Sequence, residues 1–200
     1  INSGKKNTLK DYKNIYDQAY KTTQKPIAMI ITCCDSRILE NSIFGGNVGD
    51  YFIHRNIANI VPSINDKENN IPTLSAIEYA LKVLKIPNLI ILGHSNCGGV
   101  EYSYKTFKDK KNLNNFEYIS KWVSCLDIPF NKIPKDITEN EKITFLEQEN
   151  IKQSIENLYE YDFINKLIIE KKLNVIGLWY QINSGLIKFL DKQNSFIDLD

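Results

Sequence analysis

The sequence is poor in the features that mark several classes of protein. Its 200 residues include only four cysteines, fewer and less densely spaced than in a disulfide scaffold. No apolar run approaches the roughly 20 residues that span a bilayer, and no signal-peptide pattern is visible. Neither sign of charge is in excess, because 25 Lys and Arg residues stand against 24 Asp and Glu residues. These absences argue against a disulfide-rich secreted protein, a membrane protein and a nucleic-acid-binding protein, and they favour a reducing, cytoplasmic location.

The chain does have enough apolar residues for one ordinary domain. The apolar fraction is 42%, and no internal repeat or flexible linker divides the sequence. Residues 1–200 are therefore interpreted as a single domain. Residues 8–22 predict an amphipathic helix, so that residues 1–25 form an N-terminal helical arm; its apolar side chains near one face are Tyr12, Ile15, Ala19 and Tyr20.

Apolar runs between turn signals predict the strands. Continuous runs at residues 27–32 and 88–92 are typical of parallel strands buried on both faces. Further strands are expected at residues 51–54, 173–180 and 186–190. A turn at residues 183–185 predicts a hairpin between the last two.

Helical patterns lie between these strands. A helix is expected at residues 73–85 with Thr73 as its N-cap, and further helical stretches at residues 112–126 and 139–172. Residues 62–72 are interpreted as a polar loop. Strands that alternate with helices indicate an α/β fold. We expect a mostly parallel central sheet of about four strands, flanked by helices, with an antiparallel C-terminal edge strand.

Three residues follow two of the predicted strands and form a candidate metal site. Cys33 comes directly after the first apolar run, and His94 and Cys97 come after the run at 88–92. The carboxyl ends of parallel strands meet at one edge of a sheet, which is where ligands bind. Two thiolates and one imidazole suit Zn²⁺, and three ligands leave a position open for water. A bound water there has a pKa lowered towards about 7.

An alternative is a structural zinc site with a fourth protein ligand. Cys34, Cys125 or His54 would have to supply it. A dithiol redox centre is disfavoured, because the pair Cys33-Cys34 lacks the Cys-x-x-Cys spacing of such proteins.

Asp35 and Arg37 are a candidate catalytic pair beside the first ligand. On an extended segment, residues i and i+2 point to the same side, so Arg37 can hold the Asp35 carboxylate with two hydrogen bonds and keep it ionised. An ionised Asp35 can accept a hydrogen bond from zinc-bound hydroxide. The alternative is a surface ion pair, worth about 0–1 kcal/mol.

These motifs together resemble those of the β-class carbonic anhydrases. The pattern Cys-x-Asp-x-Arg at residues 33–37 is followed by His-x-x-Cys-Gly-Gly at residues 94–99, and the likeness extends to residues 52–62, 76–80 and 177–180. It thus covers nearly the whole chain. The resemblance implies reversible hydration of carbon dioxide to bicarbonate and a proton through zinc-bound hydroxide. It makes Cys33, His94 and Cys97 the zinc ligands and Asp35 and Arg37 the catalytic dyad.

The likeness is to the plant-like subtype in particular. Gln24 lies nine residues before Cys33, as does the substrate-binding glutamine of that subtype. Ile30 occupies the position where the other bacterial subtype has a tryptophan, which argues against that subtype's noncatalytic bicarbonate site. The resemblance implies a substrate pocket made by Gln24, Phe52, Ile57, Tyr79 and Gly98.

The same resemblance implies an assembly of several copies. Family members form homodimers, in some cases paired into tetramers, in which the first helix packs on the partner and pocket residues cross the interface. A hydrolase of CS₂ or COS with the same ligands and a noncatalytic zinc-binding protein remain alternative functions.

Overall fold

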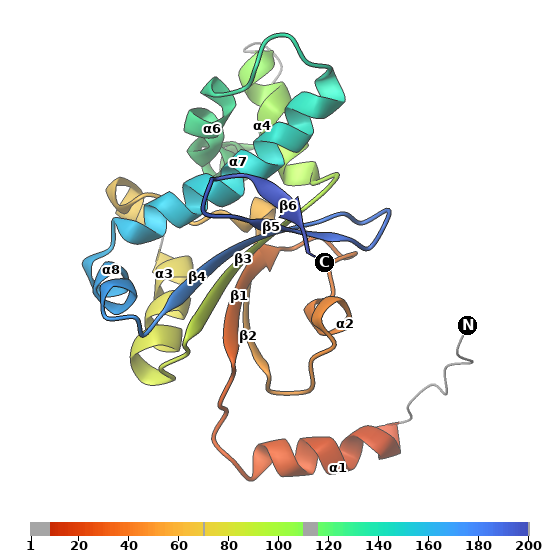
Figure 1. Cartoon of the computed structure of the whole chain (residues 1–200), viewed down its shortest axis with the longest axis vertical. Helices are drawn as coiled ribbons and strands as arrows, with labels where there is room; N and C mark the ends of the chain where they lie inside the picture. The colour runs from red at the N-terminus through yellow and green to blue at the C-terminus, as the bar shows by residue number, and fades with distance from the viewer. Residues whose placement is uncertain (1–8, 70, 110–115, 200) are drawn as a thin grey trace.

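The structure is a computed structural model that describes residues 9–69, 71–109 and 116–199. Within these residues, a single sheet contains six strands (Figure 1). Their spatial order is β2 (Tyr51–Asn56), β1 (Ala28–Cys33), β3 (Asn88–His94), β4 (Asn174–Tyr180), β5 (Ile187–Leu190) and β6 (Phe196–Asp198). The first four strands are parallel, and β5 and β6 are antiparallel additions. The predicted fold class and hairpin are confirmed, and β6 is an additional strand that was not predicted.

The helices surround this sheet. Their bounds are α1 (Leu9–Tyr20), α2 (Glu40–Phe44), α3 (Ile71–Glu78), α4 (Gly98–Lys108), α5 (Glu117–Val123), α6 (Asp127–Asn131), α7 (Glu139–Tyr159) and α8 (Asp162–Ile169). Short 3₁₀ turns lie at Ile57–Asn59, Ile64–Asn69 and Ser124–Leu126, and a π-helical turn at Tyr79–Val83 extends α3. None of the described helices is long and apolar enough to cross a membrane.

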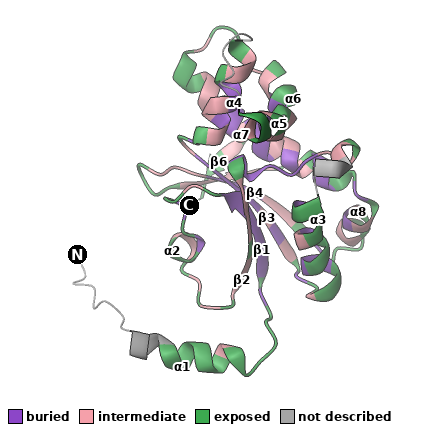
Figure 2. Ribbon diagram, turned by 180° about the vertical axis from the view of Figure 1, so that it is seen from behind, coloured by how far each residue is buried: buried purple, intermediate pink, exposed green. Residues whose placement is uncertain are grey.

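Both faces of the central strands are covered, as the continuous apolar runs predicted. On β1, Met29 and Ile31 belong to the core cluster that also contains residues of α3, α7 and α8. Ile30 points the other way, into a cluster with residues of α2 and β5. Figure 2 shows β1 as a buried strand between these layers. Two apolar layers therefore fix the position and register of the strand that carries Cys33.

The order of the strands also predicts where a ligand binds. The chain leaves β1 to form β2 on one side and returns to form β3 on the other. In open α/β sheets, ligands bind beyond the carboxyl ends of the strands at such a change of direction. A lobe made of α4, α5, α6 and the first half of α7 lies beyond these ends (Figure 1).

Two predicted elements differ from the structure. The helix expected at 73–85 begins two residues earlier, at Ile71, and Thr73 is not its N-cap: the Thr73 hydroxyl is buried and hydrogen-bonded to His54 at 3.1 Å. A 3₁₀ turn occupies much of the predicted polar loop. The mostly helical stretch expected at 139–172, in contrast, is confirmed, because it contains α7 and α8 with a short break between them.

The helical stretch expected at 112–126 is partly outside the described residues. Its described part contains α5 and a 3₁₀ turn. The N-terminal helix is present as α1, which stands away from the rest of the chain (Figure 1). Several of its apolar side chains are exposed, including Ile15 and Tyr20.

Candidate metal centre

The structure brings Cys33, His94 and Cys97 together at the carboxyl edge of the sheet. Cys33 is the last residue of β1, His94 is the last residue of β3, and Cys97 immediately precedes α4. Their ligand atoms all lie within 4.8 Å of one another, and all three residues are buried. The two sulfur atoms are 3.9 Å apart. The fold thus brings together donors from segments that are far apart in the sequence, since Cys33 and Cys97 are separated by 64 residues.

The chemistry of these donors fits zinc. His94 Nδ1 lies 2.9 Å from the Ser95 carbonyl oxygen, to which it donates, and this assigns the lone pair to Nε2. Nε2 is buried without a hydrogen-bond partner among the described residues. An unpaired imidazole nitrogen beside two thiols is a donor set that Zn²⁺ satisfies. Donation from the Cys97 thiol lowers the pKa of Cys33, which favours the thiolate that a metal requires.

Within the described residues, the cluster contains three donors and not four. Cys34 is exposed, and His54 is bonded to Thr73. The Cys125 thiol instead donates to Asp66 at 3.5 Å, and burial raises its pKa to about 12. None of the three candidates for a fourth ligand is in the cluster, which favours an open, catalytic type of site over a structural one.

Asp35 and Arg37 lie beside the open side of the cluster. Arg37 Nε and Nη2 donate to the two carboxylate oxygens of Asp35 at 2.9 and 2.6 Å. Nη2 also donates to the Asn96 carbonyl at 2.9 Å. The guanidinium hydrogen bonds hold the pKa of Asp35 well below its usual range, so the carboxylate is ionised. Asp35 Oδ2 is 4.0 Å from His94 Nε2.

The expected extended geometry of this dyad is wrong. The Arg37 backbone N–H also donates to Asp35 Oδ1 at 2.9 Å, which closes a turn at this point of the chain. An aspartate that bonds the backbone two residues on forms an Asx turn. The turn, rather than a strand, therefore aligns the two side chains.

A buried polar stripe on α7 supports the cluster, and the sequence analysis did not find it. Glu147 accepts the backbone N–H of Cys97 at 3.0 Å, and Asn150 donates to the Ala58 carbonyl at 2.7 Å. Further along, Ser154 and Asn157 bond the backbone of Val61. The spacing of three, four and three residues, which places polar side chains on one helix face, was the available signal.

The segment held by Asn150 wraps around Cys33. Ala58 and Asn59 are buried, with φ values of 63° and 47°, in the left-handed region that non-glycine residues rarely adopt. This conformation turns the Ala58 backbone N–H to the Cys33 sulfur, a hydrogen bond that helps to lower the pKa of that thiol. The side chain of Asn56 bonds both backbone groups of Ile60 at 2.9 Å, which closes the turn.

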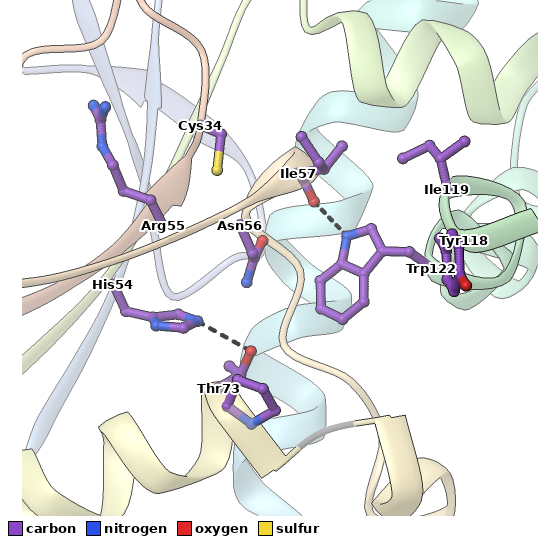
Figure 3. Close-up of a pocket in the computed structure, with 10 residues that line it drawn as sticks. Cys34, His54, Arg55, Asn56, Ile57, Thr73, Tyr118, Ile119 and Trp122 are labelled. Carbon is purple, nitrogen blue, oxygen red and sulfur yellow. Dashed lines mark hydrogen bonds between the residues drawn. The ribbon is translucent and has the colours of Figure 1, made fainter. Parts of the chain in front are cut away.

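A cavity of about 550 Å³ opens beside these segments (Figure 3). Ile57, one of the predicted substrate contacts, lines it, and the Trp122 indole N–H donates to the Ile57 carbonyl at 2.7 Å. Figure 3 shows His54 and Thr73 paired on the opposite side of this space. Apolar side chains such as Ile119 and Trp122 line it together with polar ones such as Asn56, and none of the three metal ligands is among its lining residues.

Three other predicted substrate residues are far from the metal cluster of their own chain. Gln24 is exposed and precedes β1, at the opposite end of the strand from Cys33. Phe52 pairs with Met29, four residues before Cys33, which places it about 13 Å back along the sheet. Tyr79 stacks on Phe52 with ring centroids 5.9 Å apart. Gly98, in contrast, directly follows Cys97 and begins α4.

Comparison with known proteins gives consistent matches. A family model described as "Carbonic anhydrase" matches residues 28–187. A curated carbonic anhydrase of Helicobacter pylori strain J99 is 30% identical over 96% of this chain and 88% of its own length. Beta carbonic anhydrase 3 of Arabidopsis thaliana is 30% identical over 90% of this chain and 70% of its own length.

Solved structures match as well. The β-carbonic anhydrase CcaA superimposes with a TM-score of 0.86 at 26% identity, covering 96% of this chain and 85% of its own. A structure from a study of two tetrameric β-carbonic anhydrases of Sordaria macrospora gives a TM-score of 0.75 at 30% identity, with 89% and 87% covered.

Proposed function

This chain belongs to the β-class carbonic anhydrases, and from that premise we propose how its own residues carry out the zinc-dependent, reversible hydration of carbon dioxide. The enzyme is a zinc lyase that acts on carbon dioxide and bicarbonate. The observation that carries the assignment is the buried cluster of Cys33, His94 and Cys97 with an ionised Asp35 beside it. Neither hydrolysis of CS₂ or COS nor noncatalytic zinc binding is favoured.

Cys33, His94 and Cys97 would hold the zinc. When bound, zinc lowers the pKa of a water molecule towards about 7 and so supplies the nucleophile for carbon dioxide. The chain's part is to keep two thiolates and one neutral imidazole aimed at one point. It does so through the ends of β1 and β3 and through the hydrogen bond from His94 Nδ1 to Ser95.

Asp35 orients the reacting water, and Arg37 orients Asp35. The carboxylate is 15% exposed and close to His94 Nε2, so it can accept a hydrogen bond on the open side of the cluster. The paired bonds from Arg37 leave the carboxylate little freedom to rotate. Held in this way, Asp35 keeps Oδ2 beside His94 Nε2, at the edge of the metal cluster.

The substrate pocket is completed by a second copy of the chain. Ile57 and Gly98 are supplied in cis, but Gln24, Phe52 and Tyr79 are too far from their own metal cluster. The edge strand β2 and the exposed apolar side chains of α1 offer a surface for a partner. Oligomerisation is supported by the tetrameric Sordaria macrospora relatives. We infer a homodimer in which Gln24 of each chain serves the partner's site.

A reducing cytoplasm is the proposed location. None of the four cysteines forms a disulfide, and two of them are in the metal cluster. Zinc-bound thiolates of this kind are favoured where thiols stay reduced.

Stopped-flow measurement of carbon dioxide hydration on the zinc-loaded protein tests the function. We expect fast turnover that rises across about pH 6.5 to 9, a range around the pKa of about 7 for the activated water. Removal of zinc with a chelator abolishes it, and added Zn²⁺ restores it. Absence of turnover at one zinc per chain contradicts the assignment, and assays with CS₂ and COS then test the alternative.

A further inference from the structure

We propose that Glu147 is a positioning residue of the metal site, which holds Cys97 where its sulfur lies beside the Cys33 sulfur and the His94 imidazole. This inference rests on the proposed zinc site. Glu147 lies on α7, fifty residues beyond Cys97 in the sequence, yet the Cys97 backbone N–H donates to its Oε1 at 3.0 Å. The residue is only 2% exposed. A carboxylate that deeply buried requires specific hydrogen-bond donors, and one of its donors belongs to a metal ligand.

The loop that carries Cys97 needs such an anchor. Asn96 has a φ of 58°, in the left-handed region, and this conformation persists only where surrounding contacts impose it. Cys97 lies between the end of β3 and the start of α4, so neither element supplies an acceptor for its N–H. Glu147 provides that acceptor from a separate helix. The side chain therefore ties the position of Cys97 to α7.

The carboxylate is itself oriented by the sheet. The Trp179 indole N–H donates to Glu147 Oε2 at 3.2 Å. Trp179 belongs to β4 and pairs with Gly93, next to His94. Oε1 thus accepts from the ligand loop and Oε2 from β4, and the Asn96 backbone N–H of the same loop also interacts with this carboxylate. Two buried side chains, Glu147 and Trp179, thus connect Cys97 to β4, the strand that pairs with β3 beside His94, and outer hydrogen bonds of this kind preorganise a metal site.

Ser154 offers a matched comparison on the same helix face. It is buried to a similar degree, at 1% exposure, and also bonds a loop backbone, because the Val61 N–H donates to its Oγ at 3.0 Å. Val61 is not adjacent to any of the three ligands in sequence. Loss of the Ser154 hydrogen bond should therefore lower stability without affecting the metal site.

The decisive variant is Glu147→Gln. Glutamine has the shape of glutamate but presents one acceptor and one pair of donors, so it cannot accept from both Cys97 and Trp179. We expect zinc affinity of the full-length protein, measured by competition with a chromophoric chelator, to fall about 10- to 100-fold. We also expect the absorption bands of the cobalt-substituted protein to shift, because the sulfur of Cys97 moves. Ser154→Ala should leave both readouts unchanged while lowering the melting temperature.

A second variant tests the geometry. Trp179→Phe removes the indole N–H that donates to Glu147. In the double variant with Glu147→Gln, the new amide carbonyl can therefore accept from the Cys97 N–H while the amide NH₂ group no longer faces the indole N–H. The substitution at Glu147 should therefore cost less zinc affinity in the Trp179→Phe background than in the wild type. If Glu147→Gln does not fold, Glu147→Asp, whose shorter side chain cannot reach both donors, takes its place.

Two kinds of failure are separable. A wild-type protein that binds no zinc would refute the proposed function. Tight zinc binding by the wild type with unchanged affinity and cobalt spectrum in the Glu147 variants would refute the positioning role alone. An equal loss of affinity in Ser154→Ala would also refute it, because the effect would then be one of general stability.

Discussion

At the scale of single residues, the metal site has two features. The charges of its donors balance the charge of Zn²⁺, and a carboxylate beside the donors is kept ionised. Cys33 and Cys97 as thiolates balance the charge of Zn²⁺, and His94 adds none. Asp35 stays ionised because Arg37 donates to both of its oxygens. The roles of ligand and hydrogen-bond acceptor are therefore divided between different side chains, which allows each to be tested separately.

Substitution Asp35→Asn should remove most of the carbon dioxide hydration activity and leave zinc in place. Asparagine offers one acceptor instead of two, and its amide group faces a guanidinium that can only donate. A loss of about 10²-fold or more in kcat is the size expected for removal of a positioned polar group of this kind. Zinc content by atomic absorption is the control, because Asp35 is not a ligand. Undiminished turnover would contradict the role given to Asp35.

At the scale of the elements, the first turn of α4 contains two adjacent glycines, Gly98 and Gly99, that differ in how closely they pack. An added Cβ at Gly99 would lie 2.6 Å from Ile57 Cγ2 and 3.3 Å from the Ala58 Cβ, whereas one at Gly98 meets nothing within 4 Å. Gly99 therefore permits α4 to approach the left-handed turn that bonds Cys33. The start of α4 thus packs on the turn at Ile57 and Ala58, and the backbone of that turn bonds Cys33.

Gly99→Ala should destabilise the protein by about 1–3 kcal/mol, the usual cost of inserting a methyl group into a packed site. Gly98→Ala is the matched control and should be neutral or stabilising by up to about 1 kcal/mol, since alanine favours the helix. Urea unfolding monitored by circular dichroism measures both values. Equal effects of the two substitutions would show that the contact with Ile57 does not limit the approach of α4.

At the scale of the whole molecule, the proposed substrate pocket is not complete within one chain. The metal ligands lie at the carboxyl ends of β1 and β3, but Gln24 and Phe52 lie towards the amino ends of β1 and β2. Side chains separated by the length of a strand cannot meet within a single sheet. A second chain that packs along β2 can bring them together, and α1 has exposed apolar side chains with which to hold it.

Removal of residues 1–20 should weaken association, because it deletes α1 but keeps Gln24. The specific activity should then fall as the protein is diluted, and light scattering should show smaller particles. Gln24→Ala is the complementary variant: it should keep the assembly of the wild type and lose activity at every concentration. A truncated protein with unchanged size and activity would show that α1 is not part of the interface.

Mixed assemblies test whether Gln24 acts on the partner's site. Gln24→Ala and Cys33→Ser should each be inactive as homodimers. After unfolding and refolding together, a mixed dimer contains one site with intact zinc ligands and an intact Gln24 from the other chain. Activity of the mixture above that of either parent is the expected result. A mixture as inactive as its parents would place Gln24 in cis or outside the site.

Local sequence patterns were enough to predict the parallel strands, the hairpin and the three donors that the fold brings into one cluster. Apolar runs long enough to be buried on both faces predicted β1 and β3, and the residues that follow them predicted Cys33, His94 and Cys97. These inferences succeed because hydrophobic periodicity and ligand chemistry are local properties. The predicted extended form of the Asp35–Arg37 segment failed because the Asp35 side chain bonds its own backbone.

The surroundings of the metal cluster depend on long-range contacts, which the sequence does not reveal. Thr73 was predicted as a helix cap and proved to be the buried partner of His54. Glu147 and Asn150 carry no signal as ligands, since their partners are backbone groups of loops far away in the sequence. The separation of Gln24 from the metal cluster likewise cannot be predicted until it is known that β1 runs from the end near Gln24 to the end that carries Cys33. Contacts of this kind depend on which segments the fold brings together, and no local pattern in the sequence encodes that choice.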